Sequence, residues 1–526
     1  MDAVRRSPRL ALGMLAVSNL LLYSAWLGYS PVYMHEAEVL FALHARSIAA
    51  TLRDSNGTFL PLYFHMPAIG ANVWFHPTIV YLTALVLKVL PFSEWSVRFP
   101  SAIVGTIDVV LMYLVARRLF DGDRRYALVA AAMLALTPAH FIHSRLEMDY
   151  LYPVPFVLGW LWCLVTFDDT GDARLIWAAG FVLGLGFYSY IAAVAFMPLY
   201  LVFTWAYLFA KGRRIRSGHL VVTVAFCVPL IFFVTWRILY PDVFSGTAYR
   251  YAITRRGVVF GVLHLLHYNV IGDYVSNYWN FFNPNFLFLV GSPNFQSSTR
   301  SAGVFLIPVA LFLAVGSYDV LACRRRFRWL LVAGLVTAPI PAVLVEEPYA
   351  VYRELEILVF AVLIATFGVR RLLNAERKAW RGVAAAGLIV MPLQFGYFLH
   401  DYFTDYRLNS FGWFGWNLKG AVSQVIAISG ERPVPAVYLG SNIAYGRERW
   451  QFYLAVDGCE DLLARTHVFD ASVRIADIPR GSLVIARPED GEVRDPRLQS
   501  APARKIADIT EPFGDRLTSF VIFERQ

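Results

Sequence analysis

The sequence predicts an all-α polytopic membrane domain followed by a small α/β domain. Of its 526 residues, 57% are hydrophobic and only 16% are charged, and the mean hydropathy of +0.51 is typical of multi-span membrane proteins. Long apolar stretches recur up to residue 399, and short strand-like segments follow only after residue 400. We therefore expect a transmembrane domain at residues 1–400 and an α/β domain at residues 401–526.

About eleven apolar stretches approach the ~20 residues that a helical crossing needs. The first follows basic residues, as in a signal peptide, but no small-residue cleavage site comes after it, so we expect a retained helix. The stretches are 10–29, 98–116, 126–142, 150–167, 174–190, 191–210, 219–240, 302–318, 329–345, 354–369 and 382–399.

The basic residues predict the orientation of the chain. With this number of crossings, all basic loops fall on one side together with the N-terminus, and the positive-inside rule makes that side cytoplasmic. Charges in these loops account for the net charge of +9, so nucleic acid is not an expected partner. The loops are Arg117–Arg125, Lys211–Arg216, Arg324–Arg328 and Arg370–Arg381.

The segment His76–Pro91 is apolar but does not fit this count. If it crossed the membrane fully, every later basic loop would lie outside. We therefore expect it to lie in the outer interface or to re-enter without crossing. A true crossing, compensated by another that the pattern misses, is the alternative.

The polar C-terminal part has a different pattern. Short alternating apolar segments predict strands, and one further segment predicts a helix. The four cysteines have no disulfide or metal-binding spacing. The expected strands are Val434–Gly440, Gly481–Ala486, Lys505–Ile509 and Thr518–Phe523, and the expected helix is Arg447–Ala455.

Two acidic clusters lie beside apolar stretches on the expected outer side, where carboxylates are costly and usually functional. Glu36 and Glu38 begin a predicted helix, and for Glu36 stabilisation of the helix dipole is as good an explanation as catalysis. Glu147 and Asp149 lie two residues apart, so a turn must present them. There they can orient a sugar hydroxyl, hold a divalent cation or take a proton, and a local ion pair with Arg145 is the alternative.

Further candidate binding residues lie in other outer segments. Arg353 precedes an apolar stretch, and its guanidinium can bind the phosphate of a lipid headgroup bidentately. Snorkelling of this side chain to the interface is the alternative. Tyr278 and Trp279 belong to a run of aromatic and amide side chains that suits a carbohydrate or an interfacial anchor equally well.

Four segments, in this order, resemble the GT-C membrane glycosyltransferases, and more narrowly the bacterial members of the protein-mannosyltransferase and aminoarabinose-transferase superfamily. The resemblance covers roughly residues 10 to 400. The segments are the loop Arg53–Leu62, the helix start Ser93–Ala102, the loop Phe286–Phe288 and the turn at Arg353.

The resemblance implies an enzyme of the bacterial inner membrane that uses a polyprenyl-phosphate-linked sugar. The acceptor would be a lipid, glycan or protein on the periplasmic face, where the C-terminal domain would also lie. Family members carry an Asp-Glu pair in the first outer loop, and here Glu38 aligns with the Glu but Ala37 with the Asp. Either Glu36 has replaced the Asp or the activity is altered. Gly291-Ser292 likewise stands where the family often has Gly-Asp.

On this resemblance we expect an inverting transfer in which Glu36 or Glu38 deprotonates the acceptor hydroxyl. Arg353 would stabilise the leaving phosphate, with Arg145 or His76 as candidates to assist.

Glu147 and Asp149 would bind the acceptor or a divalent cation, the single cofactor we consider. A transporter or flippase of lipid-linked sugars is the rival function, but transporters tend to show repeated halves, and this sequence has no internal repeat. A catalytically altered scaffold is a third possibility. The sequence does not determine the sugar, the acceptor or the oligomeric state.

Overall fold

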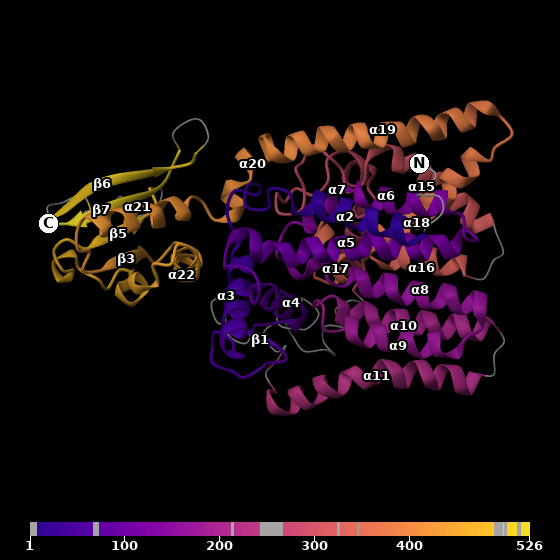
Figure 1. Cartoon of the computed structure of the whole chain (residues 1–526), viewed down its shortest axis with the longest axis horizontal. Helices are drawn as coiled ribbons and strands as arrows, with labels where there is room; N and C mark the ends of the chain where they lie inside the picture. Colours follow the sequence, from indigo (N-terminus) through magenta and orange to yellow (C-terminus); the bar gives the residue numbers. More distant parts are fainter. Residues whose placement is uncertain are drawn as a thin grey trace. The chain divides into compact units, whose positions relative to one another are not determined.

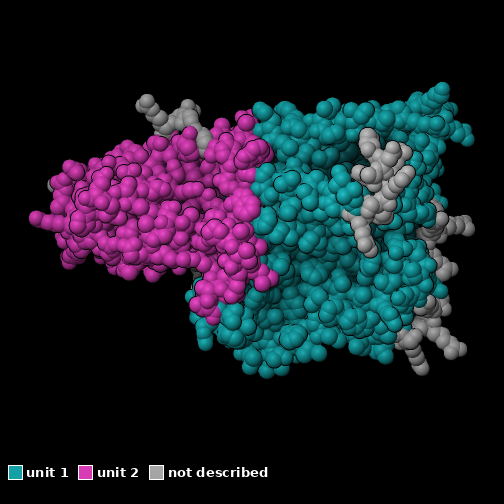
Figure 2. All heavy atoms as spheres, in the orientation of Figure 1, with its two compact units in different colours: residues 1–25, 52–82, 98–402 teal, residues 26–51, 83–97, 403–526 magenta. Residues whose placement is uncertain are grey.

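The computed structural model describes residues 8–66, 73–211, 215–241, 243, 267–322, 327–345, 347–488, 498, 502–512 and 517–526. Parts of two predicted basic loops, 212–214 and 323–326, lie outside the described residues. The chain divides into two compact units (Figure 2). Unit 1 comprises Met1–Ala25, Leu52–Leu82 and Arg98–Tyr402, and unit 2 comprises Trp26–Thr51, Thr83–Val97 and Phe403–Gln526.

Unit 1 is helical, and every predicted apolar stretch coincides with a helix or a pair of short helices (Figure 1). Among the described residues, five helices are long and apolar enough to cross a bilayer on their own, so the prediction of a polytopic helical domain is confirmed. Two stretches are interrupted before Pro138 and at Pro339, because proline cannot donate the helical hydrogen bond. The helices are α2 (Pro8–Ser24), α5 (Glu94–Leu119), α6 (Arg124–Ala135), α7 (Pro138–His143), α8 (Val154–Thr170), α9 (Ala173–Gly186), α10 (Ala193–Ala210), α11 (Ile215–Leu239), α14 (Tyr268–Asn280), α15 (Ile307–Ala322), α16 (Arg328–Thr337), α17 (Ile340–Leu344), α18 (Glu356–Leu373) and α19 (Lys378–Phe403).

Helix α18 lies at the centre of unit 1 and is buried from Glu356 to Val369. It packs closely against α15, where a Cβ atom at Gly316 or Gly368 would collide with the backbone of the facing helix. Small residues at such a contact let two membrane helices approach through their backbones. Helices α8 to α11 pack beside one another in the same unit (Figure 1).

The segment His76–Pro91 contains a short helix, α4 (Pro77–Leu87). Its 11 residues span only about 16 Å at ~1.5 Å per residue, roughly half of a ~30 Å hydrocarbon core. This length fits an interfacial or re-entrant helix. Whether α4 crosses the membrane stays a prediction.

Cysteine labelling tests this prediction. Single cysteines at Ser55 and Ser93, which flank α4, should react with a membrane-impermeant maleimide in cells with an opened outer membrane. A cysteine at Asp121, beyond the far end of α5, should react only after the inner membrane is permeabilised, and protection of Ser93 together with Asp121 would show that α4 crosses.

The C-terminal part of unit 2 is built on a five-stranded sheet of order β4-β3-β5-β7-β6. Strands β4, β3 and β5 are parallel, whereas β7 pairs antiparallel with both β5 and β6. The predicted strands and the predicted helix are all present. The sequence pattern missed β4, which is four residues long and exposed at its two central positions, and also missed α21. The elements are α21 (Leu418–Glu431), β3 (Val437–Gly440), α22 (Gly446–Val456), β4 (Thr466–Phe469), β5 (Leu483–Ala486), β6 (Ala503–Thr510) and β7 (Thr518–Arg525).

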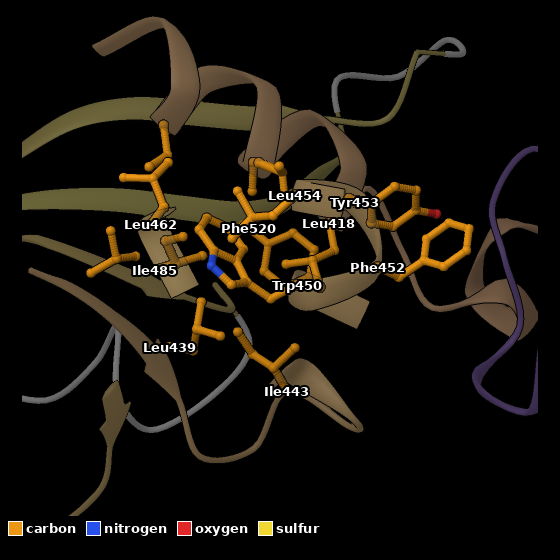
Figure 3. Close-up of a cluster of buried hydrophobic side chains, with 14 of the residues drawn as sticks. Leu418, Leu439, Ile443, Trp450, Phe452, Tyr453, Leu454, Leu462, Ile485 and Phe520 are labelled. Carbon is orange, nitrogen blue, oxygen red and sulfur yellow. The ribbon is translucent and has the colours of Figure 1, made fainter. Parts of the chain in front are cut away.

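The core of unit 2 includes part of the first predicted outer loop. Trp450 of α22 packs among apolar side chains of the sheet and of α21 (Figure 3). The same core contains Met34 and the apolar face of α3 (Glu36–Thr51), and Lys419 forms a 2.8 Å ion pair with Glu94. Unit 2 therefore differs from the predicted domain 401–526, because it also includes residues 26–51 and 83–97, some of whose apolar side chains lie in its core.

Candidate functional site

Two short 3₁₀-helices bring Asp149 and Arg353 together in unit 1. Helix η2 (Asp149–Leu151) precedes α8, helix η4 (Val351–Arg353) precedes α18, and the two pack against each other. The Asp149 carboxylate is buried and interacts electrostatically with the Arg353 guanidinium. Two ionisable groups that are far apart in the sequence therefore share one location.

Tyrosines surround this pair of charges. The ring of Tyr150 lies 4.9 Å from that of Tyr352 and 5.4 Å from that of Tyr190, measured between centroids. The Tyr190 hydroxyl accepts a hydrogen bond of 3.4 Å from Arg353 Nη1. The group Asp149, Tyr150, Tyr190, Tyr352 and Arg353 is called the Arg353 cluster below.

Arg353 is already held in the geometry with which it would bind an anion. Its Nε and Nη2 donate to the two carboxylate oxygens of Glu347 at 2.6 and 2.9 Å. Tyr352 donates to the same carboxylate at 2.7 Å, and burial followed by the Glu347 charge raises the pKa of Tyr352, so its hydroxyl stays a neutral donor. A bidentate fork that fits a carboxylate also fits a phosphate. Arg353 is only 18% exposed, which does not agree with simple snorkelling.

Glu147 is fully buried beside this region. Its Oε2 accepts hydrogen bonds from Ser101 Oγ at 2.9 Å and from the Tyr152 hydroxyl at 3.3 Å. These contacts join the turn before α8 to α5, so the structure supports a positioning role for Glu147 more directly than contact with a substrate.

Arg145 is also fully buried, and its contacts belong to the fold. Its Nη1 donates to the carbonyl oxygens of Tyr23 and Ala25 at 2.9 and 2.6 Å, and its guanidinium stacks over Phe141 and Tyr402. A guanidinium held in this way stabilises the junction with α2. We therefore do not retain Arg145 as a phosphate ligand.

His76 lies edge-on to Tyr63, with 5.3 Å between the ring centroids. Burial lowers the pKa of His76 to about 3. Burial therefore disfavours the charged form of this imidazole, and the assistance of His76 to a leaving phosphate stays a prediction.

Tyr278 and Trp279 lie on α14 and face different surroundings. The Tyr278 hydroxyl donates to the carbonyl oxygen of Val336 at 2.8 Å, whereas the Trp279 side chain is 63% exposed. This hydrogen bond joins Tyr278 to the last turn of α16. The choice between a carbohydrate platform and an interfacial anchor stays open for Trp279.

In unit 2, Glu38 rather than Glu36 caps the helix α3. Glu38 is buried, and its Oε2 accepts a 2.9 Å hydrogen bond from the backbone N–H of His35, the residue before the helix. His35 Nδ1 in turn accepts from the Ala37 N–H at 3.1 Å. This arrangement is similar to a capping box, but histidine replaces the usual serine or threonine and accepts from the second rather than the third N–H of the helix.

Glu36 is held by a residue that sequence reasoning missed. Its Oε2 forms a 2.7 Å ion pair with Nη2 of Arg449 on α22, and its Oε1 lies 3.2 Å from His35 Nε2. Because His35 Nδ1 is an acceptor, its Nε2 carries the proton and donates to Glu36. Glu36 is still 29% exposed. No local signal marks Arg449 as a partner, because its contact with Glu36 is made only by folding.

A metal centre formed by the protein alone is not evident. Within the described part of the chain, no three His, Cys, Asp or Glu side chains gather as metal ligands. A magnesium ion needs only one or two carboxylates when a substrate phosphate completes its shell, so the predicted divalent cation stays a prediction.

Comparison with solved structures shows the fold of the protein. The chain is similar to ArnT from Cupriavidus metallidurans, solved bound to undecaprenyl phosphate, with a TM-score of 0.57, 12% identity and 98% of both chains covered. It is also similar to the Archaeoglobus fulgidus oligosaccharyltransferase, with a TM-score of 0.50 and 13% identity, over 90% of this chain and 66% of that one. The protein is a multi-pass membrane protein with the GT-C fold, as the sequence resemblance predicted.

Sequence comparison points to particular relatives. Residues 76–237 match the model of the dolichyl-phosphate-mannose-protein mannosyltransferase family. The chain is also 27% identical over 185 residues to YkcB of Bacillus subtilis (strain 168), a protein named as a mannosyltransferase. That match covers 34% of this chain and spans only a quarter of the length of YkcB (25%).

Proposed function

We propose that this protein is a membrane glycosyltransferase that moves a sugar from a polyprenyl-phosphate carrier to an acceptor hydroxyl. The observation that carries the proposal is the Arg353 cluster, in which a bidentate guanidinium lies among tyrosine hydroxyls near a buried carboxylate. The similarity to ArnT, which was solved with undecaprenyl phosphate, and to mannosyltransferases supports the same chemistry.

Arg353 takes the role of phosphate ligand. A donor phosphate replaces the Glu347 carboxylate on its guanidinium, and Glu347 is 41% exposed and can turn towards solvent. The acceptor oxygen forms a bond to the anomeric carbon as the bond from that carbon to the phosphate oxygen breaks. The electron pair leaves with the phosphate, so no general acid is needed and stabilisation of the phosphate charge performs the equivalent task.

A carboxylate removes the proton of the acceptor hydroxyl, and we assign this role to Glu36. Glu38 is buried and occupied as a helix cap, whereas Glu36 is partly exposed and its oxygens retain lone pairs beyond those used by Arg449 and His35. Asp149, in the Arg353 cluster, is the alternative base. We also propose that the transfer inverts the anomeric centre. The active site would lie on the periplasmic face of a bacterial inner membrane.

A transfer assay on the purified protein tests the proposal. In nanodiscs, the protein is given undecaprenyl phosphate carrying radiolabelled mannose or aminoarabinose, together with extracted envelope lipids and proteins as acceptors. We expect consumption of one donor with release of undecaprenyl phosphate. Movement of intact donor between the leaflets of liposomes, with no cleavage, would identify a flippase instead. A protein that neither cleaves nor moves the donor would be a scaffold altered at Ala37.

A further inference from the structure

The segment Tyr33–Glu38 is attached to the C-terminal sheet domain by polar contacts at successive residues, all within unit 2. The Tyr33 hydroxyl donates to Glu511 Oε2 at 2.6 Å, and the Met34 N–H donates to the Tyr453 hydroxyl at 3.2 Å. Burial raises the pKa of Glu511, whose other oxygen accepts from the Asn417 N–H at 3.0 Å.

The helix that follows is part of the hydrophobic core of the same domain. Val39, Ala42 and Leu43 of α3 are buried in one cluster with Trp450 and Phe452. At the exposed side of α3, Arg46 forms a bidentate ion pair with Glu460, at 2.6 and 2.7 Å. The position of α3 is therefore determined by its packing on this domain.

Contacts other than the ion pair with Glu36 hold the Arg449 side chain in place. Its side chain is only 6% exposed, and its Nη1 donates to the Ala444 carbonyl at 3.2 Å. The guanidinium lies over Gly415, where any Cβ atom would collide with it and where φ is +91°. A buried cation whose own contacts fix its position can hold a partly exposed carboxylate in one orientation.

We infer that the C-terminal domain positions the first outer loop for catalysis, with Arg449 as the positioning residue that orients the Glu36 carboxylate. The catalytic part of this inference rests on the proposed function. The attachment of α3 to the domain does not.

The experiment compares Arg449→Met and Arg449→Lys with Arg447→Met, an exposed arginine on the same helix. Hydrogen exchange of the peptide covering residues 33–44 reports the position of the loop without any activity. Steady-state kinetics with whichever donor the transfer assay identifies report catalysis. Arg449→Met should speed exchange of this peptide and lower kcat by roughly 10²-fold with little change in the donor KM, because a misplaced base affects the chemical step.

Arg449→Lys should recover part of both losses, and Arg447→Met should match the wild type in both readouts. Unchanged exchange in Arg449→Met would overturn the positioning role, and faster exchange with normal kcat would overturn its link to catalysis. If Arg449→Met does not fold, Glu36→Ala removes the same contact from the other side and should speed exchange equally. If the wild-type protein consumes no donor, the proposed function is refuted. The hydrogen exchange of residues 33–44 would still test whether the C-terminal domain holds the first outer loop.

Discussion

Replacing Glu36 with Gln should lower turnover by ~10²–10⁴-fold, the usual effect of removing a general base. The substitution keeps the size of the side chain and removes its ability to take the acceptor proton. Binding of the donor should change little, since the phosphate is bound by a different residue. The measurement is kcat and the donor KM of the purified variant in the transfer assay.

Three matched variants make this result specific. Glu38→Gln keeps an acceptor for the His35 N–H, so the cap of α3 and the turnover should both be largely kept. Glu431→Gln, at an exposed position, should change nothing. Asp149→Asn separates the two candidate bases, because a normal rate in Glu36→Gln beside an inactive Asp149→Asn would move the base to the Arg353 cluster.

Replacing Arg353 with Lys should weaken use of the donor although the positive charge stays. A lysine ammonium cannot reproduce the two parallel hydrogen bonds of the guanidinium, and hydrogen bonds to charged groups contribute about 1.5–3 kcal/mol each. Loss of one such bond corresponds to roughly a 10- to 100-fold rise in the apparent donor KM. Arg480→Lys, at an exposed position, is the matched control.

Glu347→Gln adds a second test of the same site. If the donor phosphate replaces the Glu347 carboxylate on Arg353, removing that negative charge should lower the donor KM. An unchanged KM in both Arg353→Lys and Glu347→Gln would count against the phosphate role and would leave the Glu347 pair as an element of the fold.

Hydropathy predicted the helices of the membrane domain. Each apolar stretch coincides with a helix, because a chain in lipid must satisfy its backbone hydrogen bonds within the segment. The strands of the C-terminal sheet that alternate clearly were also predicted, whereas β4 was missed. Its central residues, His467 and Val468, are exposed, so they carry little of the pattern that marks a buried strand.

The individual site residues could be proposed from their chemistry but their partners could not. Asp149 and Arg353 were both candidates, and their shared location depends on the packing of η2 against η4. Tyr190 and Tyr352 had no motif to mark them, although both lie in aromatic-rich turns. Arg145 was misjudged, because nothing in the sequence shows that its guanidinium is buried against backbone carbonyls.

The sequence by itself determined the class of this protein: its hydropathy predicts the helical membrane domain, and its ordered motifs predict the GT-C fold. Only the tertiary structure decided which glutamate caps α3 and which one faces Arg449. Glu36 and Glu38 have the same chemistry, and only the directions of their side chains differ. It also decided that α3 belongs to the core of the C-terminal domain. Burial of an apolar helix face needs a partner surface, and that surface is assembled from residues hundreds of positions later in the chain.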